Sequence, residues 1–314
     1  MTNEIINLDG WGKCLKLSND VVELTTTLDL GPRIIGFNLI GGENIFNPIG
    51  KVDPIVTDFG DFYTYGGHRL WHAPEGKPRS YVTDNDPIKY ELTETGAIFY
   101  YNYEKETGMD KNFEIILGED ASLYVRHTLT NRNIWPLKCA CWGLTIMSPG
   151  GRFIMPQEPF IPNTKKLLPA RPLVLWNYTN MADPRWTWGR RFVTLKNDAN
   201  ILIPQKVGFM DKLGWACYEK EGTVFMKNFN FYEDAEYVDY GCNVETFTNG
   251  TFHEFETVGP IKNLNQGESA IYTEKWTLFA NVQLPEDEDG MADILFNLAD
   301  KAKKAFVKDI LTDN

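Results

Sequence analysis

Apolar and polar residues alternate in most segments of the chain, and this alternation is the feature that most constrains the fold. Period-two alternation occurs in residues 21–30, 33–40, 96–106, 111–117, 122–131, 251–260 and 269–280. Successive side chains of a strand point to opposite faces of a sheet, so this pattern predicts strands with a buried face. Glu221-Gly222 separates two further segments of this kind and is typical of a hairpin turn. We therefore expect an all-β, mainly antiparallel sandwich with strands from about residue 20 to 280.

Two regions differ from this pattern. Residues 148–190 are rich in proline and too long for an ordinary turn, and loops of that length are usually functional or mobile. This region is either a lid over a sheet face or one rim of a ligand cleft. Near the other end, residues 290–312 carry an apolar stripe with helical spacing, which predicts a C-terminal amphipathic helix. No internal repeat or linker divides the chain, so we predict a single domain over 1–314 with its core at about 15–280.

Composition and charge limit the classes of partner that the protein can bind. The chain has 31 Lys and Arg against 43 Asp and Glu, a formal net charge of −12. Such an acidic surface repels phosphate backbones and anionic membranes, so we expect neither as a partner. No apolar run approaches the ~20 residues of a membrane span. The amino terminus lacks signal-peptide character, and the five cysteines have no framework spacing, so we expect a cytoplasmic protein. The expected assembly is a monomer or homodimer.

The segment "YGGHRLWHAPE" contains two of the four histidines of the chain. On a helix, His68 and His72 would lie roughly 6 Å apart and could share a zinc ion. The two glycines and the proline around them disfavour a helix, and in a strand the two residues would lie about 13 Å apart. We therefore predict no metal and no cofactor. A metal bound by His68, His72 and Glu75 would require the segment to fold sharply.

In the extended form, His68 and His72 share one face of the strand while Arg69 and Trp71 share the other. One interpretation is structural: a histidine bonds within the core, and Arg69 pairs with a carboxylate. The second interpretation is a binding cleft, which the density of polar and aromatic side chains favours. No nucleotide-binding glycine motif and no GxSxG nucleophile motif occurs in the chain.

A second cluster contains three glutamates. Glu254 and Glu256 share a strand face about 6.6 Å apart, with His253 and Phe255 on the other face. Burying two carboxylates side by side raises the pKa of at least one of them. Glu245 is a third acid nearby in the sequence. A glycosidase pair must flank the scissile bond from opposite sides, so neighbours on one strand make hydrolysis a less favoured function.

Three segments resemble galactose mutarotase-like (aldose 1-epimerase) proteins. They are "GPRIIGFNLIGGENIF", "YGGHRLWHAPE" and "VETFTNGTFHEFETVGPIKNLNQGES", the last followed by "EKW". The resemblance covers about residues 15–280 and is nearest to an uncharacterised bacterial branch, a domain of unknown function. It implies a β-supersandwich with a sugar-binding cleft on one concave sheet face. The expected partner is therefore a small-molecule carbohydrate.

The resemblance also implies isomerase chemistry. In this family a glutamate takes the proton of the anomeric hydroxyl and a histidine protonates the ring oxygen, so that the sugar ring opens and closes again. The glutamate falls on Glu254 or Glu256, of which we favour Glu256, with Glu254 as its modulating neighbour. His72 or His68 would be the acid. The expected substrate-binding residues are Arg69, Trp71 and Glu75 of the histidine segment, Arg185 and Trp188 of the proline-rich region, and Glu245.

The chain departs from the family pattern at its histidines. In "TNRNIWPLKCACWGLTIMSPGG", Trp142 and Gly143 stand where the family's acid histidine would be expected. An alternative function is therefore a non-catalytic sugar-binding or sensing module on the same fold. A lyase or hydrolase is a third, less favoured possibility.

Overall fold

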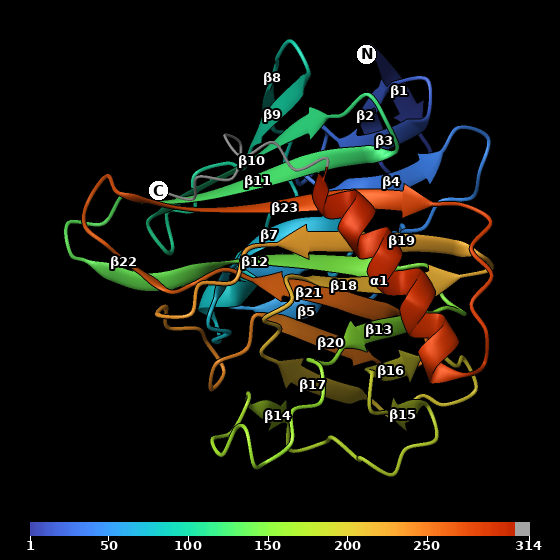
Figure 1. The fold of residues 1–314 in the computed structure, drawn as a ribbon. Helices are drawn as coiled ribbons and strands as arrows, with labels where there is room; N and C mark the ends of the chain where they lie inside the picture. The colour runs from blue at the N-terminus through green and yellow to red at the C-terminus, as the bar shows by residue number, and fades with distance from the viewer. Residues whose placement is uncertain (305–314) are drawn as a thin grey trace.

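Most of the alternating segments form antiparallel strands in the computed structural model, which describes residues 1–304 (Figure 1). The first sheet runs in the order β1 (Thr2–Leu8), β2 (Gly12–Ser18), β3 (Val22–Thr27), β4 (Ile34–Leu39), β7 (Gly67–Ala73), β12 (Leu137–Met147), β21 (His253–Val258), β20 (Val244–Thr248), β17 (Gln205–Phe209) and β14 (Leu173–Leu175), with β22 (Lys262–Leu264) paired to β12. The expected all-β sandwich is thus confirmed, and its strands begin well before residue 15.

The second sheet packs against the first. Its order is β15 (Trp186–Trp188), β16 (Phe192–Lys196), β13 (Arg152–Pro156), β18 (Trp215–Lys220), β19 (Thr223–Phe229), β23 (Ser269–Phe279), β11 (Ser122–Asn131), β10 (Met109–Leu117), β9 (Gly96–Tyr100) and β8 (Lys89–Leu92). A separate small hairpin consists of β5 (Ile55–Thr57) and β6 (Gly60–Phe62). A 3-10 turn, η1 (Arg79–Tyr81), follows β7.

The core between the sheets is strongly aromatic. Phe46 contacts Phe225 and Trp276 edge-on, with ring centroids 5.3 and 5.4 Å apart, and Phe37 of β4 joins the same group. Phe225 lies on β19 and Trp276 on β23, so these rings join the two sheets. Each such pair adds about 0.5–1.5 kcal/mol beyond its buried area. The aromatic content of the sequence is therefore used in large part for packing.

A polar network crosses the same core. His127 Nδ1 lies 3.1 Å from the carbonyl oxygen of Tyr272, so this nitrogen donates and Nε2 of His127 is left as an acceptor. His68 Nε2 lies 2.8 Å from that acceptor and donates to it. His68 Nδ1 in turn accepts from the Thr145 hydroxyl at 2.8 Å. Both histidines are fully buried and neutral, because burial lowers the pKa of each.

Gly143 on β12 is required by this network. A Cβ at Gly143 would lie 2.3 Å from Oε1 of Glu274, whose other oxygen accepts from Trp276 Nε1 at 2.6 Å and pairs with Lys227 at 3.2 Å. We expect Gly143→Ala to lower the free energy of unfolding by about 1–3 kcal/mol through overpacking. Urea denaturation measures this, with Gly50→Ala as the control because a Cβ there meets nothing within 4 Å. Equal stability of the two variants would contradict the prediction.

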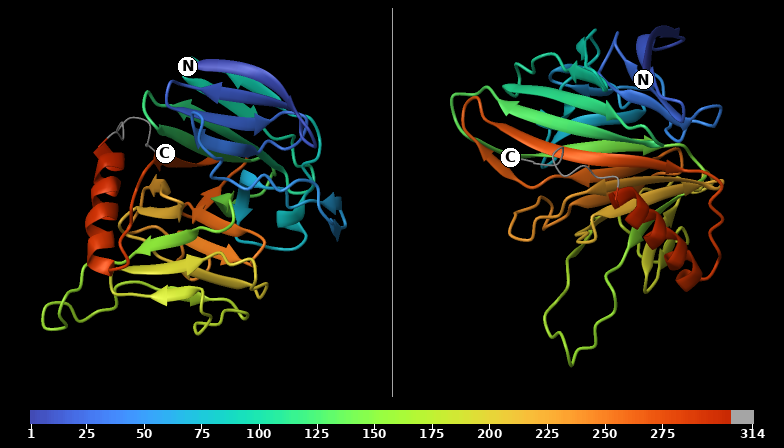
Figure 2. Two further views of the ribbon diagram at one scale, coloured as in Figure 1. Left: turned by 90° about the vertical axis from the view of Figure 1, so that its right-hand side faces the viewer. Right: turned by 45° about the horizontal axis from the view of Figure 1, so that its top comes forward.

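The region expected to be a long loop is more ordered than predicted. Residues 148–190 contain β13, β14 and β15, each of which pairs into a sheet. The segment between β13 and β14 does project from the sheets (Figure 2), and Leu167 at its tip is 89% exposed. Strands of three residues are too short to show alternation, so the sequence alone did not reveal β14 and β15.

The expected helix is confirmed over its first part. Helix α1 (Glu288–Lys304) lies on the outer side of the second sheet (Figure 2), where Leu295 and Ala299 are buried. The Glu288 carboxylate accepts hydrogen bonds from the backbone N–H groups of Arg191 and Phe192 at 2.6 and 2.9 Å. The predicted continuation to residue 312 lies outside the described residues. Within residues 1–304, no helix combines the length and the apolar character needed to cross a membrane.

Candidate functional site

A pocket opens on the face of the first sheet that points away from the second sheet. We call it the sheet pocket; its volume is about 260 Å³. Its lining consists of Ile55, Phe62, Thr64, Arg69, Trp71, Glu75, Tyr81, Trp142, Leu144, Tyr178, Lys206, Phe247, Phe252 and Glu254. Five adjacent strands, β7, β12, β21, β20 and β17, contribute to this lining. The sheet pocket therefore lies at the middle of the sheet, where backbone positions are well fixed.

Strand register brings the lining side chains together. Arg69 and Trp71 of β7 lie opposite Leu144 and Trp142 of β12, so all four side chains reach the same face. The rings of Trp71 and Trp142 meet edge-on with centroids 5.1 Å apart. These two tryptophans form an aromatic wall of the sheet pocket.

Arg69 is a buried cation in this wall. Its side chain is 4% exposed, and its guanidinium carbon lies 4.4 Å from the Trp71 ring centroid and 4.9 Å from that of Phe62. Burial lowers the pKa of Arg69 to about 10, which leaves it charged at neutral pH. Among the described residues, none provides a hydrogen-bond partner for Nε or Nη1 of Arg69. The aromatic faces thus hold the guanidinium while two of its nitrogens have no acceptor.

Glu254 is the carboxylate of the sheet pocket. Burial raises its pKa to about 7, although Lys206 and Arg69 both favour the charged form. The side chain is half-buried and belongs to the pocket lining. A carboxyl group with a pKa near neutral can both accept and return a proton at physiological pH.

A buried charge cluster lies beside the sheet pocket, and Lys206 connects the two. Lys206 Nζ is 2.8 Å from Glu245 Oε2 and 3.1 Å from Glu256 Oε2, and Trp142 Nε1 donates to the same Glu256 oxygen at 2.9 Å. Glu245 and Glu256 face each other across β20 and β21 and are fully buried. Burial raises the pKa of both glutamates against the pull of Lys206. Burial also opposes the charge on Lys206, but the glutamates outweigh it and hold its pKa well above the usual value.

The structure separates the predicted glutamates. Glu254 lines the sheet pocket, whereas Glu256, which the sequence favoured as the base, is bonded to Trp142 and Lys206 within the charge cluster. Glu245 belongs to the same cluster and is likewise absent from the lining. Of the other predicted residues, Arg69, Trp71 and Glu75 do line the sheet pocket.

None of the histidines, all of which the structure describes, lines the sheet pocket. His68 lies in the core network, and His72 points to the same side of β7, with Nε2 3.6 Å from Glu104. Burial lowers the pKa of His72 more than Glu104 raises it. His253 stacks on Phe153, and burial lowers its pKa to about 3. All four histidines of the chain are therefore buried on the core side of the strands.

Arg185 and Trp188 likewise lie outside the lining of the sheet pocket. Arg185 is buried and bonds to both carboxylate oxygens of Asp183 at 2.9 Å. Trp188 stacks on Trp186 with centroids 4.9 Å apart, and both lie on β15 at the edge of the second sheet. Their region nevertheless reaches the sheet pocket through Tyr178, which belongs to its lining.

The structure does not bring His68, His72 and Glu75 together as a ligand set. β7 is extended, so Glu75 lines the pocket while His68 and His72 point to the opposite side. Ligand atoms of His68, His127 and Glu274 do lie within 4.8 Å of one another. Their nitrogens are engaged in the core hydrogen bonds, and the Lys227 ammonium 3.2 Å from Glu274 would repel a cation. We therefore interpret this group as part of the packed core.

Comparison with known proteins gives a match in structure only. No protein-family model matches the chain, and no curated protein matches it in sequence. A TPR-domain containing protein from Parabacteroides distasonis superposes with a TM-score of 0.58 at 15% identity. That alignment covers 94% of this chain, which spans just over half (55%) of the other protein.

Two further solved structures are similar over nearly their whole length. A proposed mutarotase from Salmonella typhimurium has a TM-score of 0.57 at 9% identity, covering 88% of this chain and 94% of the other. A galactose mutarotase-like protein from Lactobacillus casei has a TM-score of 0.51 at 11% identity, covering 85% and 100%. The uncharacterised branch expected from the sequence stays a prediction. The fold of the chain is therefore a β-sandwich similar to that of a galactose mutarotase-like protein.

Proposed function

We propose that the sheet pocket binds a carbohydrate and that the chain interconverts the anomers of this sugar. The main support for this proposal is Arg69. This buried guanidinium lies among aromatic rings beside Glu254, and two of its nitrogens have no hydrogen-bond partner among the described residues. A sugar ring presents C–H groups that pack on aromatic faces and hydroxyl groups that bond to charged side chains. The lining of the sheet pocket offers both kinds of partner.

Anomer interconversion needs one group that takes a proton and one that gives a proton. In the proposed reaction, Glu254 accepts the proton of the anomeric hydroxyl, and the bond from the anomeric carbon to the ring oxygen breaks. The electron pair of that bond goes to the ring oxygen, which takes a proton from Lys206. An alkoxide is a far stronger base than an amine, so Lys206 can supply this proton despite its raised pKa. After rotation of the aldehyde, both protons return as the ring closes.

A second candidate function is sugar binding without catalysis. The observation that favours it is the burial of all four histidines on the core side, which leaves the sheet pocket without the acid that the family resemblance implies. The two candidates share the pocket and differ in turnover. Titration calorimetry detects binding, and NMR exchange between anomers detects turnover.

The Arg69→Met variant tests the proposed binding site. A hydrogen bond from a charged donor is worth more than a neutral one, so we expect this variant to weaken sugar binding roughly 10–100-fold. Methionine retains much of the packing against Trp71 and Phe62. The measurement is calorimetric titration of the purified chain with aldoses and their phosphates. Arg132→Met is the control, since Arg132 forms an exposed ion pair with Asp110 outside the pocket.

The outcomes separate the two candidate functions. Binding with anomer exchange supports the isomerase, whereas binding without exchange supports the non-catalytic module. Neither binding nor exchange with any aldose or aldose phosphate would overturn both. Equal affinities of Arg69→Met and wild type would remove Arg69 from the binding site.

A further inference from the structure

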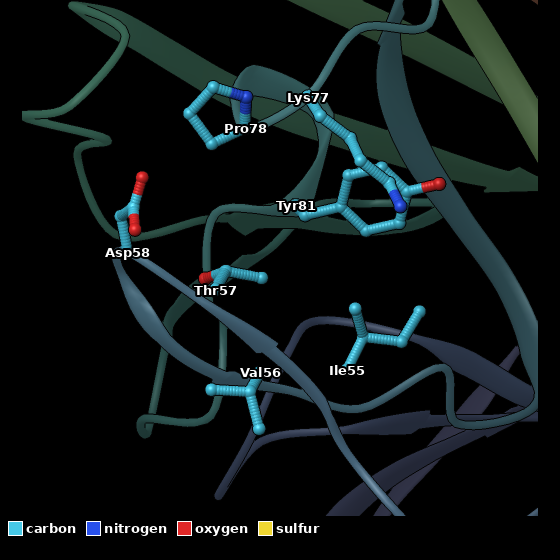
Figure 3. A pocket seen from close by; sticks show the side chains of 7 residues that line it. All are labelled: Ile55, Val56, Thr57, Asp58, Lys77, Pro78 and Tyr81. Atoms are coloured by element: carbon cyan, nitrogen blue, oxygen red, sulfur yellow. The ribbon is translucent and has the colours of Figure 1, made fainter.

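A second pocket adjoins the sheet pocket. We call it the hairpin pocket; its volume is about 270 Å³ (Figure 3). Its lining consists of Ile55, Val56, Thr57, Asp58, Lys77, Pro78 and Tyr81. Ile55 and Tyr81 also line the sheet pocket, so the two pockets meet at these side chains.

Tyr81 forms a fixed wall between the two pockets. Its hydroxyl donates to the carboxylate of Glu75, and its ring packs edge-on against Phe62 and Trp71 with centroids 5.2 and 5.7 Å away. The Lys77 ammonium lies 5.6 Å from the ring centroid within the hairpin pocket. Burial raises the pKa of Tyr81, so its hydroxyl stays protonated. One aromatic ring therefore borders both pockets.

The β5–β6 hairpin forms the opposite wall and is held in place. Its base is anchored by Phe62 against the Trp71 ring at 5.9 Å and by Asn85 Nδ2, which donates to the Asp61 carbonyl at 3.0 Å. Figure 3 shows Val56 across the pocket from Lys77 and Tyr81. Val56 is 80% exposed. The hairpin thus holds the exposed apolar side chain of Val56 in a fixed position.

The lining of the hairpin pocket matches the chemistry of a sugar ring. Val56, Pro78 and Tyr81 offer apolar surface for C–H groups. The Asp58 carboxylate offers an acceptor for sugar hydroxyls, and Lys77 provides an ammonium donor. This combination of an apolar platform with polar groups at its edge is the same as in the sheet pocket.

Size and connection indicate one extended site. The volumes of about 260 and 270 Å³ each fall just below the range of ligand pockets, ~300–1,000 Å³, and the two pockets together fall within it.

We infer that the hairpin pocket is a second sugar subsite and that the substrate is a reducing disaccharide or a longer reducing saccharide. This inference rests on the proposed function. Only the reducing ring has a free anomeric hydroxyl, so this ring occupies the sheet pocket beside Glu254, and the next ring occupies the hairpin pocket.

The experiment compares single sugars with their disaccharides. Calorimetric Kd values are measured for glucose and galactose, and for cellobiose, maltose and lactose, on three proteins: wild type, Val56→Trp and Ile134→Trp. Val56→Trp places a much larger side chain in the lining of the hairpin pocket, whereas Ile134 is equally exposed at 80% and lies outside both linings. Because both positions are on the surface, neither variant disturbs the core.

We expect wild type to bind at least one disaccharide about tenfold more tightly than the corresponding single sugar, since ~60 Å² of extra buried C–H surface corresponds to that factor. Val56→Trp should abolish this advantage and leave single-sugar affinity unchanged, and Ile134→Trp should retain it. Binding of single sugars with no disaccharide advantage in wild type would overturn the second subsite and leave the proposed function standing. An advantage that survives Val56→Trp would also overturn it. If no sugar binds, the proposed function fails as well.

Discussion

The Lys206→Met variant is expected to lose about 3–5 kcal/mol of stability at about pH 8, because it removes the cation that pairs with two buried carboxylates. Lys206 Nζ lies 2.8 and 3.1 Å from Glu245 and Glu256, and the two glutamates face each other on neighbouring strands. Neither glutamate has more than 1% exposure, so water cannot replace the lysine. Methionine fills a similar volume, which isolates the effect of the charge.

The loss should depend on pH in a defined direction. Burial already raises the pKa of Glu245 and Glu256 in the folded wild type, and removal of Lys206 raises both further. A carboxyl group with a raised folded-state pKa binds more protons in the folded chain than in the unfolded chain between the two pKa values. Its unfavourable contribution is therefore absent below the unfolded-state pKa of ~4.3 and grows as pH rises through the folded-state value. The variant should lie close to wild type at about pH 5 and fall furthest behind above about pH 8.

Urea denaturation at both pH values measures this difference. Lys138→Met is the control, because Lys138 pairs with Glu236 on the surface and exposed pairs contribute about 0–1 kcal/mol. The double variant Lys206→Met/Glu245→Gln should recover part of the loss, since one of the two opposing charges is gone. A loss of equal size at both pH values would show that packing, rather than charge, explains the effect.

The strands and their two faces follow from the sequence, but the identity of the pocket face does not. In β7, the alternation correctly places Arg69 and Trp71 opposite His68 and His72. Six of the seven residues of β7 are buried, so burial does not distinguish a solvent-exposed face of this strand. Hydrophobic alternation distinguishes a core face from a solvent-exposed face, and it does not identify the core face where both faces of the strand are buried. For this reason the sequence alone did not show that His68 and His72 lie on the core side of β7.

Residues brought together by long-range pairing were missed for a different reason. Lys206 is far from Glu245 and Glu256 in the chain, and only the order β17–β20–β21 makes them neighbours. A lysine within the apolar strand "QKVGF" is a local anomaly that pointed to a buried partner. Likewise, Asp183 two residues before Arg185 was a local signal for the ion pair that occupies this arginine.

Glu254→Gln is expected to slow anomer interconversion by about 10²–10⁴-fold while sugar binding stays within about tenfold of wild type. Glutamine retains the shape of the side chain and its ability to bond to sugar hydroxyls, but it cannot accept a proton. The measurement is NMR exchange between anomers at saturating sugar, so that a change in affinity does not enter the rate. Lost binding together with lost exchange would instead make Glu254 a binding group.

Glu256→Gln is the matched comparison, because the two glutamates lie two residues apart on the same face of β21. Glu256 accepts from Trp142 and pairs with Lys206 outside the pocket lining, so its replacement should change the rate by no more than about tenfold. The opposite result, a large loss in Glu256→Gln and a small one in Glu254→Gln, would return the catalytic role to Glu256, the residue favoured by the sequence.

The rate of anomer interconversion and the free energy of unfolding of the wild type should both depend on pH through the ionisation of Glu254. With a pKa of about 7, Glu254 becomes the active base as pH rises through neutrality, so the rate should rise over that interval and level off above it.

Stability should change in the opposite direction, because ionising a half-buried carboxyl group is unfavourable and that penalty is complete only above the folded-state pKa. Glu254→Gln removes this penalty and should be more stable than wild type by about 1–2 kcal/mol at about pH 8, with no gain at about pH 4. Loss of activity with a pH-dependent gain in stability would identify Glu254 as a group held in its place for catalysis.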